Sequence, residues 1–203
     1  MTEYLATVPT VPSALDAFIR DLAVLHERSP GGAAGLVEAT RLRLAELVVQ
    51  SGVLPAAACE GSPDGYTQHV LHVAPDRSHS VVALVWYPGQ RTPIHDHVSW
   101  CVVGVYEGEE SQTRYRLAED QGEVCLVEIG RETATPGSCT SLIPPAENIH
   151  RVANAGSGRA ISIHVYGADI ERLGSSINKT FDHLTIRPNR DHVDTTPRPW
   201  RAT

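Results

Sequence analysis

Apolar residues in the first quarter of the chain recur every three to four positions, the period of a helix that buries one face. One such segment covers residues 13–28, and Ser13 at its start is a suitable N-cap. A second segment covers residues 34–52, with Gly52 as its expected end. Pro30 and the glycines after it separate the two segments. The pattern therefore predicts two amphipathic helices at the N-terminal end.

From about residue 65 the pattern changes to short β-rich runs divided by Gly, Pro, Asp and Asn, which is typical of an antiparallel sandwich or barrel. The expected strands cover residues 66–73, 79–87, 98–106, 111–117, 123–129, 140–143, 149–153 and 160–166. The segment after about residue 180 is rich in Pro, Arg and Asp and is expected to lie over the surface or to fray. We expect one domain, 1–203, with a helical segment at 1–60, an all-β core that forms a barrel at 61–170, and a C-terminal extension at 171–203.

The composition is that of an ordinary globular domain, with 41% apolar and 20% charged residues among 203. The net charge of −7 argues against nucleic acid or an anionic membrane as a partner, because both attract basic surfaces. The N-terminal stretch does not resemble a secretory signal, and no apolar run is long enough to span a bilayer. We therefore expect a cytoplasmic protein with no nucleic-acid or membrane partner, and the sequence leaves its oligomeric state open.

Three histidines form the most informative pattern. His95 and His97 are separated by one residue, so on a strand their side chains point to the same face. His150 is the best candidate for a third ligand from another strand. Three imidazoles that converge inside a barrel are well suited to a divalent metal ion.

The segments around these histidines resemble the two sequence motifs of the cupins. The matching positions are Gly89, His95, His97 and Gly108 in the first motif, and Pro145, His150 and Asn154 in the second. The resemblance implies a jelly-roll β-barrel that encloses the metal. Cys101 stands where most metal cupins have a glutamate ligand, which leaves three neutral ligands. Such a site suits an anionic thiolate together with O2.

A second polar pattern lies on the expected last strand of the barrel. Ser162, His164 and Tyr166 alternate with Ile163 and Val165, so the polar side chains share one face. Polar groups inside a barrel are costly unless they pair, so a relay from Ser162 through His164 to Tyr166 is expected. Three satisfied sheet residues near the rim are the alternative interpretation.

Together these features resemble the cysteine dioxygenase family of thiol dioxygenases over roughly residues 60–170. That family has three iron-binding histidines and a Ser-x-His-x-Tyr triad after the third ligand. The resemblance implies Fe(II) as cofactor and O2 and a small thiol as substrates, with a sulfinate as product. Some members carry a thioether crosslink from a cysteine to the triad tyrosine, which makes a Cys101–Tyr166 crosslink a hypothesis for this chain.

The segment from Tyr66 to Val70 resembles the family stretch that binds the substrate carboxylate. Cysteine dioxygenases have arginine where this chain has Gln68, and the substitution resembles the bacterial group of 3-mercaptopropionate dioxygenase. The resemblance therefore favours 3-mercaptopropionate or a similar thiol-carboxylate. That group has a compensating arginine after the triad, for which Arg172 is the candidate, and Tyr66 is a further candidate for substrate binding. The alternatives are a cysteine dioxygenase, a cupin that binds a ligand without turnover, and a zinc or manganese isomerase.

Overall fold

The computed structural model describes residues 13–28, 31–145 and 148–189. Two helices, α1 (Ala14–Arg28) and α2 (Gly32–Val48), come first and are followed by the short 3₁₀ helix η1 (Ala56–Cys59). The Ser13 hydroxyl accepts a hydrogen bond from the Asp16 backbone N–H at 3.1 Å, and the Asp16 carboxylate accepts in return from Ser13. This reciprocal pair satisfies the backbone N–H groups of Ser13 and Asp16 at the start of α1.

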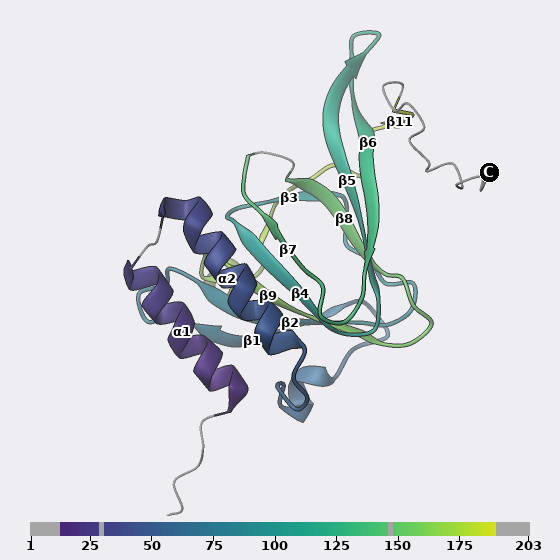
Figure 1. Ribbon diagram of the computed structural model, residues 1–203. Helices are drawn as coiled ribbons and strands as arrows, with labels where there is room; N and C mark the ends of the chain where they lie inside the picture. The colour runs from purple at the N-terminus through teal and green to yellow at the C-terminus, as the bar shows by residue number, and fades with distance from the viewer. Residues whose placement is uncertain (1–12, 29–30, 146–147, 190–203) are drawn as a thin grey trace, which may run out of the picture.

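The rest of the described chain forms two antiparallel β-sheets, with one short parallel pair at an edge (Figure 1). The five-stranded sheet has the order β1-β2-β9-β4-β7, and the six-stranded sheet has the order β10-β3-β8-β5-β6-β11. The strands are β1 (Thr67–Val73), β2 (Ser80–Trp86), β3 (His95–His97), β4 (Cys101–Glu107), β5 (Glu110–Asp120), β6 (Glu123–Ala134), β7 (Cys139–Leu142), β8 (Ile149–Asn154), β9 (Ala160–Tyr166), β10 (Ile177–Thr180) and β11 (Ile186–Arg187). The expected all-β cupin barrel with two N-terminal helices is confirmed.

Strands β2 and β9 are buried along their whole length because the five-stranded sheet is covered on both faces. The side chains on its outer face pack against Phe18 and Leu22 of α1 and Leu44 of α2. The alternate side chains, such as Val82 and Trp86 of β2, point into the barrel. Figure 1 shows both helices lying along the same side of this sheet. The helices therefore leave the inner face of β9 free to carry polar groups.

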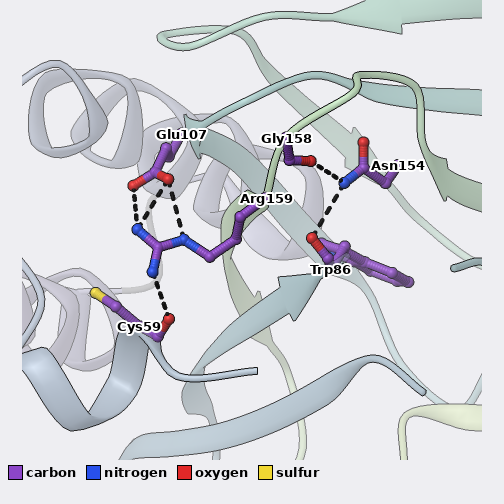
Figure 2. A network of polar contacts seen from close by, with 6 residues as sticks. All are labelled: Cys59, Trp86, Glu107, Asn154, Gly158 and Arg159. Carbon is purple, nitrogen blue, oxygen red and sulfur yellow. Dashed lines mark hydrogen bonds and ion pairs between the residues drawn. The ribbon is translucent and has the colours of Figure 1, made fainter. Parts of the chain in front are cut away.

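Two positions of the expected cupin motifs have structural roles. Gly108 has φ +72°, and a Cβ built there would lie 2.5 Å from the Arg159 carbonyl oxygen, so only glycine fits. The Asn154 side-chain amide donates to the carbonyl oxygens of Trp86, at 3.1 Å, and Gly158, at 2.8 Å (Figure 2). Asn154 thus holds the end of β2 beside the end of β8.

A second contact in Figure 2 ties the helical segment to the barrel. The Arg159 guanidinium donates to both carboxylate oxygens of Glu107 at 2.9 Å and to the Cys59 carbonyl oxygen at 2.9 Å. This bidentate pair is geometrically specific, and it anchors the end of η1 to the junction of β4 and β9.

The structure corrects several expected boundaries. The second helix ends at Val48, before Gly52, and the strand expected at 98–106 begins at Cys101. Residues 95–97 form a separate strand in the other sheet, because the chain crosses between the sheets after His97. The β5–β6 hairpin is longer than expected and extends beyond the body of the barrel (Figure 1).

The expected surface extension contains two short strands, β10 and β11, which pair with β3 and β6. Sequence reasoning missed both because they are short and mostly exposed, without the alternation of a half-buried strand. The end of this extension, residues 190–203, lies outside the described residues. No helix in the described ranges is long and apolar enough to cross a membrane.

Candidate metal centre

The structure brings the three predicted histidines together inside the barrel. His95 and His97 come from β3 and His150 from β8, and His95 is the direct cross-strand partner of His150. Their ligand nitrogens all lie within 4.8 Å of one another, and all three side chains are buried. Neighbouring strands of one sheet therefore form a compact group of three imidazoles.

Hydrogen bonds at Nδ1 orient the first two rings. The Nδ1 atom of His95 lies 2.9 Å from the Pro93 carbonyl oxygen, which can only accept, so this nitrogen carries the proton. The Nδ1 atom of His97 lies 3.0 Å from the side-chain oxygen of Asn148. Each ring therefore presents the lone pair of Nε2 toward the group centre, the arrangement found for metal-binding histidines.

The third ring leaves a buried nitrogen without a partner. The Nδ1 atom of His150 lies 2.9 Å from the Gln112 side-chain amide, while its Nε2 atom is buried and makes no hydrogen bond. An unpaired buried polar atom is costly, and a metal ion at Nε2 would satisfy it. Metal ligation at Nε2 requires a proton on Nδ1, so Gln112 would then present its amide oxygen to this ring.

All three rings are neutral near neutral pH. Burial, reinforced by the neighbouring His97, lowers the pKa of His95 to about 4, and burial also lowers the pKa of His97. Burial and the two neighbouring imidazoles hold the pKa of His150 well below its usual value. Because the rings are neutral, their lone pairs are available to a cation. Three imidazoles without a carboxylate fit ferrous iron, among other divalent transition metals.

The predicted polar face of β9 forms a continuous hydrogen-bonded chain. The Ser162 hydroxyl lies 2.8 Å from Nε2 of His164, and the Tyr166 hydroxyl lies 2.9 Å from Nδ1 of the same ring. The Trp86 indole N–H donates to the Ser162 hydroxyl at 3.3 Å. Burial lowers the pKa of His164 to about 3 and raises the pKa of Tyr166 well above its usual value, so both are neutral.

Cys101 faces this chain of polar groups. It is the direct cross-strand partner of Tyr166, and its sulfur lies 3.9 Å from Nδ1 of His164. The side chain is fully buried, and burial raises the pKa of its thiol. Cys101 therefore stands as a protonated thiol beside Tyr166, not as a ligand within the histidine group.

A narrow pocket of about 30 Å³ opens onto the histidines from between the two sheets. Tyr66 and Gln68 line it, and the Tyr66 ring stacks on Trp86 with ring centres 4.6 Å apart. The complete lining comprises Tyr66, Gln68, Leu84, Trp86, Thr92, His95, His97, Val103, His150, Val152, His164, Tyr166, Ser175, Ser176 and Ile177. Among the described residues that line this pocket, none is an arginine or a lysine.

The expected substrate-binding position of Arg172 does not agree with the structure. Arg172 is exposed on the one-turn helix α3 (Ile170–Leu173) and does not line the pocket. Ile170 is fully buried, and a residue two positions later on a helix points to nearly the opposite side. The Asp169 side chain fixes this orientation by accepting from the Arg172 backbone N–H at 3.0 Å.

Sequence reasoning missed several residues that surround the site. Gln112 and Asn148 orient the ligand rings, and Ser176 contributes a hydrogen bond that lowers the pKa of Tyr166, against the larger effect of burial. No motif spacing marks these residues. Gln112 reaches the site through the register of β5, Asn148 directly before β8, and Ser176 in the loop after α3, and none of these placements has a local sequence signal.

Comparison with known proteins agrees with this geometry. The profile of the family "Cysteine dioxygenase type I" matches residues 59–174. Among solved structures, the chain is similar to a cupin superfamily protein from Desulfitobacterium hafniense, with 18% identity and a TM-score of 0.41 over 58% of this chain and 91% of that one. It is also similar to a protein with a double-stranded beta-helix domain from Klebsiella pneumoniae, with 19% identity and a TM-score of 0.42 over 57% of this chain and 89% of that one. Since the family match covers more than half of the chain and includes the three histidines and the polar chain of β9, the protein belongs to the cysteine dioxygenase type I family.

Proposed function

We propose that this protein is an Fe(II)-dependent thiol dioxygenase that converts a small thiol-carboxylate, with 3-mercaptopropionate favoured, to its sulfinate. The overall reaction is RSH + O2 → RSO2⁻ + H⁺, in which sulfur loses four electrons and O2 gains them. The observation that carries the proposal is the group of three neutral histidines beside the chain from Ser162 to Tyr166. Membership of the family supports the same chemistry.

The three histidines would hold the metal through Nε2 on one side, with the pocket on the other. Bound Fe(II) would activate O2 and lower the pKa of a coordinating thiol. Tyr166 lines the pocket and would hydrogen-bond to the substrate, while His164 and Ser162 hold its hydroxyl in place. The apolar side chains of Leu84, Val103 and Val152 would limit water around the reacting sulfur.

Neutral groups would bind the substrate carboxylate. The polar side chains of Tyr66, Gln68 and Ser176 line the pocket, and the charge of the metal would supply the electrostatic attraction. Gln68 offers a neutral amide where a cysteine dioxygenase has arginine, so a carboxylate is held less strongly than by a bidentate guanidinium. Because both thiols carry a carboxylate, the preference for 3-mercaptopropionate over L-cysteine rests on the resemblance of the Gln68 substitution to the bacterial 3-mercaptopropionate dioxygenase group.

A panel of thiols tests the proposal directly. The protein is loaded with Fe(II) without oxygen, and O2 consumption is then measured with 3-mercaptopropionate, L-cysteine, mercaptosuccinate and cysteamine, with the product identified by mass. We expect the highest kcat/KM with 3-mercaptopropionate. A preference for L-cysteine would make the protein a cysteine dioxygenase, and the absence of O2 uptake with every thiol would favour a ligand-binding cupin.

The pairing of Cys101 with Tyr166 supports a thioether crosslink between them. Formation of the bond from Cys101 Sγ to a ring carbon of Tyr166 removes two hydrogen atoms, with O2 as the oxidant. Intact mass after aerobic turnover should therefore be lower than the sequence mass by two hydrogen atoms. Cys101→Ser should keep its full mass under the same conditions. An unchanged mass of the active wild-type protein would contradict the crosslink.

A further inference from the structure

One buried carboxyl lies beside the proposed site without a part in it. Glu110, at the start of β5, is 3% exposed, and its Oε1 atom has no hydrogen-bond partner. Burial raises the pKa of this carboxyl to about 7, while hydrogen bonding from Ser162 and Trp86 offsets part of that rise. A buried acid that titrates near neutrality beside a catalytic site is a candidate for proton transfer.

The Glu110 carboxyl lies against the inner end of the hydrogen-bonded chain of β9, next to Ser162 and Trp86. Ser162 lies between the carboxyl and Nε2 of His164, and Tyr166 continues the chain from Nδ1 into the pocket. The Trp86 N–H donates to the Ser162 oxygen at 3.3 Å and lies beside the Glu110 carboxyl as well, so the single Ser162 proton can point toward either Glu110 or His164. The direction of this one proton decides the direction of all the others.

The ionised carboxylate can only accept a hydrogen bond, so it turns the Ser162 proton toward itself. The Ser162 oxygen then accepts from Nε2–H of His164, and Nδ1 accepts from the Tyr166 hydroxyl. The Tyr166 oxygen consequently offers a lone pair to the pocket. In this state the chain is ready to take up a proton from a bound thiol.

The protonated carboxyl reverses each bond. Glu110 then donates to Ser162, Ser162 donates to Nε2 of His164, and Nδ1–H donates to the Tyr166 oxygen. The Tyr166 proton is turned into the pocket, where it can stabilise a thiolate or a substrate carboxylate. The two states differ by one proton and by the tautomer of His164.

We propose that Glu110 is the terminal proton acceptor of the Tyr166–His164–Ser162 chain and determines which nitrogen of His164 carries the proton. This inference rests on the proposed function. The thiol loses one proton for each sulfinate formed, and that proton moves to the Tyr166 oxygen while the Tyr166, His164 and Ser162 protons each move one place toward Glu110. No electron moves in this transfer, so the oxidation by O2 is a separate step.

A second cavity gives the proton a way out. Glu110 lines a cavity of about 220 Å³ on the side of the barrel near β6 and β7, together with Glu132, Cys139 and the back of the His150 ring. A cavity of this size holds several waters, which can carry the proton from Glu110 to solvent. Of the other ionisable groups in this cavity, Glu132 forms an ion pair with Arg114 at 2.6 Å, burial raises the pKa of Cys139 to about 11, and burial holds the pKa of His150 well below its usual value.

Nitrogen-15 NMR of the metal-free, full-length protein tests this role independently of turnover. The shifts of Nδ1 and Nε2 identify the tautomer of His164, whose signals are assigned by comparison with His164→Gln. In the wild type we expect the proton to move from Nδ1 to Nε2 as the pH rises through about 7, where Glu110 ionises. Glu110→Gln cannot ionise, so its His164 tautomer should not depend on pH over that range.

Two further variants complete the test. Glu132→Gln removes a carboxylate from the same cavity but away from Ser162, so the pH-dependent change should persist. Ser162→Ala interrupts the chain and should abolish the change even if Glu110→Gln does not fold. A wild-type tautomer that is constant with pH, or the same change in Ser162→Ala, would overturn the role of Glu110.

Failure of the wild type to oxidise any thiol would overturn the proposed function, whereas a pH-independent tautomer would overturn only the role of Glu110.

Discussion

A different neighbour orients each of the three imidazoles. The Pro93 carbonyl contacts His95, the Asn148 amide contacts His97, and the Gln112 amide contacts His150. Such contacts determine which ring nitrogen faces the metal and where it points. The site is therefore built from six residues rather than three, and we expect its affinity for a metal ion to depend on all of them.

Gln112→Met tests the hydrogen bond between Gln112 and Nδ1 of His150. The substitution keeps a similar volume but removes the hydrogen bond at Nδ1, so we expect Fe(II) affinity to fall about 10- to 100-fold. Anaerobic calorimetric titration measures this change. Gln50→Met, on an exposed position at the end of α2, is the matched control and should bind iron like the wild type. Unchanged affinity in Gln112→Met would show that His150 needs no such partner.

His164→Ala separates metal binding from turnover. His164 is outside the ligand group but connects Ser162 with Tyr166, so iron content should remain while kcat falls about 10²- to 10⁴-fold. Metal analysis and O2 consumption of the same preparation give both numbers. Wild-type turnover in this variant would refute the role of the relay.

Local patterns predict part of this site and not the rest. The alternation in His95–His97 and in Ser162–Tyr166 places those side chains on one face of a strand, which sequence alone indicates. The neighbours of these residues depend on pairing between distant strands. Glu110, for example, lies opposite Asn154 on β8 and Ala134 on β6, a register that no short segment specifies.

At the scale of elements, α2 covers the outer face of the sheet that carries the relay. The helix approaches β4 so closely that a Cβ built on Gly104 would lie 2.9 Å from a Val48 methyl and 3.0 Å from both the Cys139 sulfur and Leu44. The helix and the strand therefore pack in direct contact at Gly104, where there is no room for a side chain. The periodicity that predicts α2 reveals its apolar face but not this contact.

Gly104→Ala should consequently destabilise the protein by about 1–3 kcal/mol, because the helix must move away from the strand or its side chains must leave their preferred conformations. Urea denaturation of the metal-free protein measures the free energy of unfolding. Gly130→Ala is the matched control, since a Cβ there meets nothing within 4 Å. Equal stability of the two variants would argue against close packing of α2 on β4.

For the whole molecule, a second group of histidines connects α1 to the barrel. His79, which is buried just before β2, stacks on His26 of α1 with ring centres 3.9 Å apart. Burial, reinforced by His26 and His72, lowers the pKa of His79 to about 4. The folded protein therefore favours the neutral form of His79, and protonation of this ring favours unfolding.

Because this pKa is lower in the folded than in the unfolded protein, His79 contributes stability that is present above about pH 6.5 and is lost as the pH falls toward 4. The loss is on the order of 3 kcal/mol. His79→Phe keeps the stacking on His26 and should lose less stability on acidification of the metal-free protein. His183→Gln, at an exposed position, should follow the wild type. Parallel pH profiles of His79→Phe and wild type would contradict this account.

Oxygen-isotope labelling tests the central claim most directly, that three imidazoles hold iron for the transfer of both atoms of O2 to a thiol. The Fe(II)-loaded protein is supplied with 3-mercaptopropionate and ¹⁸O2, and the product is weighed by mass spectrometry. The account predicts a sulfinate that carries two heavy oxygen atoms, formed by the wild type and absent with His150→Ala. A sulfinate with one heavy oxygen or none, or a disulfide as the only product, would contradict it.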